Sequence, residues 1–148
     1  MLVEIKKATE EDINLVAPLF DAYRVFYKQP SNEQAAADFL YSRLSNDESV
    51  IFIALLNDVA VGFCQLFPIF SSVGLKRTWL LNDLYVNENA RGKGIAGILL
   101  QNAKEFGTQT NARWLLLQTG ADNYIAQSVY EKNGWVKVTD FFYELPLE

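Results

Sequence analysis

The stretch NARGKGIAGILL at residues 89–100 decides how the rest of the chain is interpreted. It follows an apolar run at residues 78–86 that has the length and composition of a buried strand, and it opens a helix expected over residues 92–106. Two glycines near the helix start keep its first backbone N–H groups uncovered. The positive end of the helix dipole and two cations, Arg91 and Lys93, then favour an anion such as a diphosphate at this turn.

Two other phosphate-binding turns do not fit this stretch. The GxxxxGK[ST] spacing of a P-loop is absent. A dinucleotide-binding turn needs a third glycine at a fixed distance after Gly94, and it needs a βαβ series that the preceding residues do not form. From the residues alone, two interpretations stay open. The turn is either an anion site or an ordinary strand-to-helix connection with a solvated basic pair.

The composition is that of a folded domain with a sizeable core. Of the 148 residues, 50% are apolar and 14% are aromatic, which excludes a disordered chain, and the length suits one domain over residues 1–148. No apolar run is long enough to cross a membrane, and residues 1–7 lack the apolar core of a signal peptide, so we expect a cytoplasmic location. The net charge of −5 disfavours nucleic acid as a partner.

Histidine is absent, and Cys64 is the single cysteine. These two facts exclude catalysis by a Ser-His or Cys-His pair, and they argue against a zinc site, so no metal is expected. Cys64 lies in the apolar run at residues 61–67, which indicates a small buried side chain rather than a catalytic thiol.

Hydrophobic periodicity predicts the elements on either side of the turn. Strands are expected at residues 2–7, 50–56, 59–70, 78–86, 113–119, 135–138 and 141–145. Helices are expected after Thr9, after Ser31 or Asn32, at 92–106 with Gly107 ending the helix, and at 123–132. The resulting order, β-α-α-β-β-β-α-β-α-β-β, predicts an α+β fold with a mixed sheet.

Two motifs in this order resemble those of the GNAT N-acetyltransferases. Arg91-x-x-Gly94-x-Ala96 is similar to the family's Gln/Arg-x-x-Gly-x-Gly/Ala signature, and LNDLYV at residues 81–86 is similar to its fourth strand. A second signature is matched by Asn123-x-x-Ala126-x-x-x-Tyr130-x-x-x-Gly134-Trp135, with Trp where Phe is usual. The motif text looks closest to the spermidine/spermine-type branch.

The resemblance implies an enzyme that moves an acetyl group from acetyl-coenzyme A to a primary amine. It implies that the pantetheine arm pairs with the backbone of the strand and that the diphosphate takes N–H groups from the turn. The cofactor-binding residues implied are Leu84, Tyr85, Val86, Arg91, Gly92, Lys93, Gly94, Ile95, Ala96, Asn123 and Tyr130. Read without the resemblance, Asn123 is equally a helix N-cap and Tyr130 a core aromatic.

The resemblance also implies that Tyr130 protonates the departing thiolate. A phenol with a pKa of about 10 is able to donate that proton at neutral pH. The family's usual Glu base is replaced by Asn82, which cannot accept a proton. Asp83 is therefore the catalytic candidate for the base, although period-2 alternation places it on the opposite face from Asn82. Asp83 is equally able to have a structural role. The amine would then attack directly in a ternary complex, either arriving deprotonated or losing its proton through a water chain to solvent.

The expected acceptor is a small cationic amine, either a polyamine or an amino-acid-like compound. The resemblance implies that the first two helices and the hairpin loops build the acceptor side. In this acidic chain they carry aromatic and acidic residues that suit a cation, Tyr23 and Asp21 among them. A protein lysine or N-terminus is the alternative acceptor, and a coenzyme A sensor without activity is an alternative of another class. The aromatic residues 141–143, on an expected edge strand, predict a homodimer.

Overall fold

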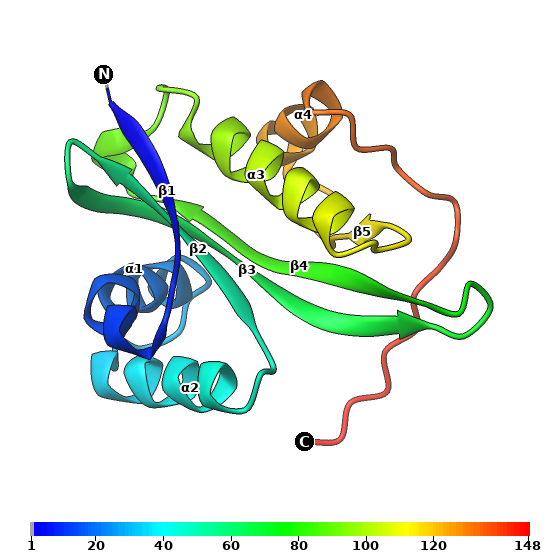
Figure 1. Ribbon diagram of the computed structural model, residues 1–148, viewed down its shortest axis with the longest axis horizontal. Coiled ribbons are helices and arrows are strands. Elements are labelled where there is room, and N and C mark those ends of the chain that lie inside the picture. The colour runs from blue at the N-terminus through cyan, green and yellow to red at the C-terminus, as the bar shows by residue number, and fades with distance from the viewer. Residues whose placement is uncertain (1) are drawn as a thin grey trace. The chain divides into compact units, whose positions relative to one another are not determined.

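The computed structural model describes residues 2–148, and within them five strands form one sheet in the order β1-β2-β3-β4-β5 (Figure 1). The bounds are Val3–Lys7 for β1, Val50–Leu56 for β2, Val59–Ser71 for β3, Lys76–Val86 for β4 and Leu115–Leu116 for β5. The pairs β1–β2, β2–β3 and β3–β4 are antiparallel, whereas β4 and β5 are parallel. The mixed sheet predicted from the sequence is confirmed.

The described residues fall into two compact units, one ending at Gln118 and the other comprising Thr119–Glu148. The first holds the sheet with helices α1 (Ile13–Phe26), α2 (Glu33–Ser45) and α3 (Ile95–Gln109), and the short 3-10 helices η1 (Glu10–Asp12) and η2 (Glu88–Ala90). The second holds α4 (Tyr124–Lys132). None of the helices described is long and apolar enough to span a membrane.

Helices α1 and α2 cover one face of the sheet, and α3 covers the other (Figure 1). The side chains of β2 alternate between these two layers. Ile51 and Ile53 pack into the core formed with α1 and α2, whereas Phe52 meets Phe106 of α3 edge-on, with ring centroids 5.3 Å apart. Burial on both faces explains why β2 is a continuous apolar run in the sequence.

The predicted starts of the first two helices and the predicted hairpin turn are confirmed by local geometry. The Thr9 N–H donates to Asp12 Oδ2 at 2.8 Å, as a capping box requires. The Asn32 side chain accepts from the Ala35 N–H at 3.0 Å and caps α2. Both residues of the Asn57-Asp58 turn have positive φ, which a two-residue type I′ hairpin turn demands.

The predicted bounds of α3 and β5 are wrong. Strand β5 covers Leu115–Leu116, whereas the pattern predicted a strand at residues 113–119. Helix α3 starts at Ile95 rather than at residue 92, because the two glycines before it adopt positive φ. It continues past Gly107 to Gln109. Gly107 is buried, and a Cβ there would lie 3.0 Å from a methyl carbon of Leu115, so this glycine lets α3 approach β5 closely rather than ending the helix.

The two last predicted strands, at residues 135–138 and 141–145, are absent from the described chain. Their apolar side chains are largely exposed, with Phe141 at 87% and Tyr143 at 96%. A strand needs a neighbouring edge to receive its hydrogen bonds, and an isolated pair of strands is marginally stable. The sequence pattern identified segments suited to a sheet without showing which edge would pair with them.

Candidate active site

The turn between η2 and α3 is shaped by two glycines. Gly92 and Gly94 both have a φ of +78°, a region that side chains with a Cβ avoid. A Cβ at either position would meet nothing within 4 Å. Gly94 is the N-cap of α3, and no side chain caps this helix. The glycines are therefore required by the backbone conformation, and the space in front of the helix N-terminus is open.

Backbone donors line this open space. Among the described residues, no acceptor bonds the N–H groups of residues 92–97, and the first hydrogen bond of α3 runs from the Ile98 N–H to the Gly94 carbonyl at 3.1 Å. The Arg91 N–H is different, since it bonds the Glu88 carbonyl at 3.4 Å. Several uncommitted donors at the positive end of a helix dipole attract an anion. The residues present therefore fit a diphosphate.

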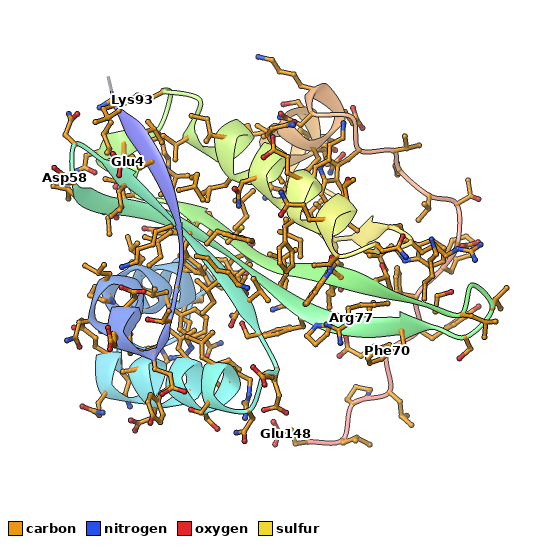
Figure 2. The ribbon with its side chains drawn as sticks, viewed as in Figure 1. Glu4, Asp58, Phe70, Arg77, Lys93 and Glu148 are labelled. Carbon is orange, nitrogen blue, oxygen red and sulfur yellow. The ribbon has the colours of Figure 1, made fainter. Side chains whose placement is uncertain are left out.

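The two cations of the turn are placed differently. The Arg91 Nε donates to the Val86 carbonyl at 2.9 Å, and the guanidinium lies 5.7 Å from the Tyr85 ring and 5.9 Å from the Phe26 ring. Arg91 thus ties the turn back to β4 and α1. Lys93 is exposed and forms no ion pair with a described residue. Figure 2 shows Lys93 at the end of the sheet where the β2–β3 turn lies.

Strand β4 has an open edge beside the turn. Within the described chain, β5 pairs with β4 at two positions, so residues 81–86 have a strand neighbour on the β3 side alone. The Asn87 N–H points toward β3, where it bonds the Val61 carbonyl at 2.7 Å. Alternation then directs the N–H groups of Leu84 and Val86 to the open edge. An extended group carrying amides is able to add to such an edge.

A bulge interrupts β4 just beyond the point where β5 stops pairing. Gln65 pairs with Asp83 and Leu66 pairs with Leu81, which leaves Asn82 as the extra residue. The bulge breaks the two-residue alternation. The expectation that Asp83 and Asn82 face opposite sides is therefore wrong, because the Asn82 Nδ2 donates to Asp83 Oδ1 at 3.0 Å.

Asp83 is a buried carboxyl, 4% exposed, within a chain of hydrogen bonds. Its Oδ2 accepts from Gln65 Nε2 at 2.5 Å, and the Gln65 Oε1 accepts from the Ser49 hydroxyl at 2.7 Å. Burial raises the pKa of Asp83 above its usual range, against the lowering effect of hydrogen bonds from Gln65, Tyr23 and Asn82. No described cation pairs with it. Asp83 therefore holds a proton more readily than an exposed aspartate.

Gln65 and Ser49 were not predicted as parts of this cluster, and Tyr23 was expected only as one of several aromatic residues on the acceptor side. One signal was available, since Gln65 is a polar side chain inside the apolar run 61–67, and it is fully buried. The expectation for Cys64 in the same run is confirmed. Its thiol is buried, and burial raises its pKa to about 12, so it stays neutral.

The second unit contains the remaining candidates. Asn123 is the N-cap of α4, and its Oδ1 accepts from the Ala126 N–H at 3.2 Å, so its capping role is confirmed. The Tyr130 ring lies 6.3 Å from the Trp135 ring, centroid to centroid. Gly134, with a φ of 92°, follows the end of α4. Roles for Asn123 and Tyr130 toward a cofactor stay predictions.

Comparison with known proteins identifies relatives over most of the chain. Residues 16–135 match the model of the acetyltransferase (GNAT) family. The chain is 48% identical over 139 residues to an uncharacterized N-acetyltransferase, YhfO, of Bacillus subtilis, covering 94% of this chain and 93% of the relative. It is 36% identical over 134 residues to a probable acetyltransferase of Haemophilus influenzae, covering 90% of each. The crystal structure of a probable acetyltransferase shares 45% identity over 98% of both chains, with a TM-score of 0.93.

Proposed function

The chain belongs to the GNAT acetyltransferase family, and we propose that it moves the acetyl group of acetyl-coenzyme A to the primary amine of a small cationic acceptor. The observation that carries the proposal is that strand β4 and the turn after it hold three features in sequence: the buried carboxyl of Asp83, an open strand edge and the donor-lined turn. The net charge of −5 and the aromatic rings beside that carboxyl favour a cation as the acceptor.

In this proposal the cofactor lies along β4. The N–H groups of residues 92–96 hold its diphosphate, and the backbone of Leu84 and Val86 pairs with its pantetheine arm. From residue 86 back to residue 81, an extended strand spans about 17 Å, which carries the arm to the bulge at Asn82. Bound acetyl-coenzyme A supplies the thioester carbonyl that the amine attacks. Asn123 contacts the pantetheine arm in addition to capping α4.

Two side chains handle protons in the proposed reaction. Asp83 takes up the proton that the acceptor amine must lose before it attacks. Tyr130 donates a proton to the sulfur that leaves. Asp83 suits its part because a carboxyl whose pKa is raised accepts a proton more readily near neutral pH. Asn82, the residue in the position of the family's usual base, contributes a hydrogen bond to Asp83 instead.

The acceptor class is tested with a panel of amines, by following thiol release from acetyl-coenzyme A. Diamines, polyamines and amino-acid-like amines are expected to give a kcat/KM at least about tenfold above that of neutral amines of the same size. Turnover confined to lysine peptides or peptide N-termini would show that the acceptor is a protein and not a small amine. Tight coenzyme A binding with no turnover of any amine would instead identify a sensor.

We also propose that the protein is a homodimer, since residues 141–143 present exposed aromatic side chains (Phe141, Phe142 and Tyr143). Light scattering at micromolar concentration should give twice the chain mass of 16.8 kDa. A Phe141→Ser, Tyr143→Ser double variant should then give the mass of one chain while still binding coenzyme A. A wild-type protein with the mass of one chain would contradict the proposal.

A further inference from the structure

We propose that the hydroxyl of Tyr23 touches the acceptor amine and passes the amine's proton to Asp83. This inference rests on the proposed acetyl transfer and adds to it a catalytic residue from α1, outside both sequence motifs. Three observations lead to it. They are the contact of the Tyr23 hydroxyl with the β4 bulge, the burial of the Asp83 carboxyl, and the neutral hydrogen-bonded chain behind that carboxyl.

Tyr23 reaches across from α1 to the bulge. Its hydroxyl lies 3.5 Å from the Asn82 carbonyl and within hydrogen-bonding reach of the Asp83 carboxyl, so the same O–H is able to donate to either acceptor. The Tyr23 ring is held by four other rings, with centroids 5.0 to 6.3 Å away: Phe20, Tyr27, Phe63 and Tyr85. This packing fixes the direction of the ring, so the hydroxyl is directed at the bulge before any acceptor arrives.

Burial keeps the acceptor away from Asp83 itself. The carboxyl is 4% exposed, and its Oδ2 is bonded to Gln65, which is fully buried. Tyr23 is only half-buried, so its hydroxyl is the end of this cluster that an incoming amine is able to reach. The exposed neighbour Asn82 carries an amide, which neither gains nor loses a proton near neutral pH. A base as buried as Asp83 therefore needs a hydroxyl between itself and the amine.

The groups facing Asp83 leave it suited to receive one proton. Gln65 and Ser49 form the chain on its β3 side and are neutral. Cys64 of β3 points to the other face of the sheet, and its buried thiol, with a pKa raised to about 12, carries no charge. Tyr23 faces Asp83 from α1. Burial raises the pKa of Asp83, so its carboxylate accepts the Tyr23 proton more readily. The ammonium group of the acceptor replaces the proton that Tyr23 gives up.

The step balances in protons and electrons. A proton of the ammonium group moves to the Tyr23 oxygen as the Tyr23 proton moves to the Asp83 carboxylate, which frees the nitrogen lone pair. That pair forms the bond to the thioester carbonyl carbon, the C–S bond breaks, and the sulfur is protonated by Tyr130. The second amine proton returns to Tyr130 through solvent as the amide forms. The net proton of the reaction stays on Asp83 until it leaves to solvent.

Tyr23→Phe tests the relay because it removes the hydroxyl and keeps the ring contacts. At pH 7, kcat/KM is expected to fall about 10- to 100-fold, with coenzyme A affinity and melting temperature unchanged. The matched control is Tyr27→Phe. It removes a hydroxyl from the neighbouring ring, 5.0 Å away centroid to centroid, and should leave the rate unchanged. Wild-type turnover in Tyr23→Phe would overturn the inference.

The basicity of the acceptor distinguishes proton transfer from simple binding. An alkyl ammonium with a pKa of about 10.4 must lose a proton at pH 7, whereas an α-amine with a pKa of about 7.8 is already partly deprotonated. Tyr23→Phe should therefore slow the more basic amine several-fold more than the less basic one. An equal loss for both amines would mean that Tyr23 only binds the acceptor, and would overturn the relay.

A double-mutant cycle with Asp83→Asn provides the second test. The fold should persist, because the Gln65 amide is able to turn around and the Ser49 hydroxyl to rotate, so that the chain of bonds is kept. If both groups serve one relay, the double variant should be no slower than the slower single variant. Rate losses that multiply would overturn the relay. Turnover of peptides alone would refute the small acceptor, but the Tyr23→Phe comparison and the double-mutant cycle would both remain measurable with that peptide. Turnover of no amine at all would refute both the proposed acetyl transfer and the relay.

Discussion

Gly94→Asp should weaken acetyl-coenzyme A binding about a hundredfold or more, as measured by titration calorimetry. The new carboxylate would lie in the open space before the unbonded N–H groups of residues 92–97, where the diphosphate is expected. It would repel the diphosphate and compete for the same donors. The backbone should tolerate the change, since Asp adopts positive φ more readily than most residues do.

Gly94→Asn is the matched control for this variant, because it has the same shape and a similar tolerance of positive φ but no charge. It should lose far less affinity than Gly94→Asp. The difference between the two should shrink as the salt concentration rises, since exposed charges are screened. Equal losses in the two variants would assign the effect to blocked space alone. A folded Gly94→Asp variant that binds acetyl-coenzyme A like the wild type would show that the diphosphate does not bind at this turn.

The turn was predictable because its signals are local. A strand pattern, two glycines and a helix pattern follow one another within residues 78–106, and glycine permits the positive φ that both positions adopt. The helix bound at Gly107 was not predictable in the same way. Whether a glycine ends a helix or lets it pack closely depends on the partner, and that partner, Leu115, is set by the sheet.

The proton-handling cluster was only partly predictable. Asp83 stood out because it follows the position of the expected base, but the bulge depends on how β3 and β4 register, which no local pattern encodes. Tyr23 lies 60 positions earlier in the chain than Asp83. The periodicity of α1 placed it on the core-facing side of a helix without indicating which strand residue it would meet.

The last two strands illustrate the opposite error. The apolar residues at 135–138 and 141–145 satisfy the local preference for a strand, yet the described chain contains none there. A strand is stabilised by its neighbour's backbone, so a correct local pattern is insufficient. The exposed side chains of this segment are the reason for testing whether a second copy covers them.

Tyr130→Phe should lower kcat by about ten- to a thousandfold, the range expected for losing a positioned general acid. Only a hydroxyl is removed, so the ring contact with Trp135 and the helix α4 should persist, and coenzyme A affinity should change little. The matched control is Tyr124→Phe, which removes a hydroxyl from an exposed residue of the same helix and should leave the rate unchanged.

The two tyrosines are distinguished by the acceptor. Tyr130 acts on the departing sulfur in this proposal, so its removal should slow strongly and weakly basic amines by the same factor. Tyr23 acts on the amine, so its removal should slow the strongly basic amine more. Measuring kcat for both variants with both amines therefore separates the acid from the base. Wild-type turnover in Tyr130→Phe would show that its hydroxyl protonates nothing during the reaction and that the residue serves as a packed aromatic side chain.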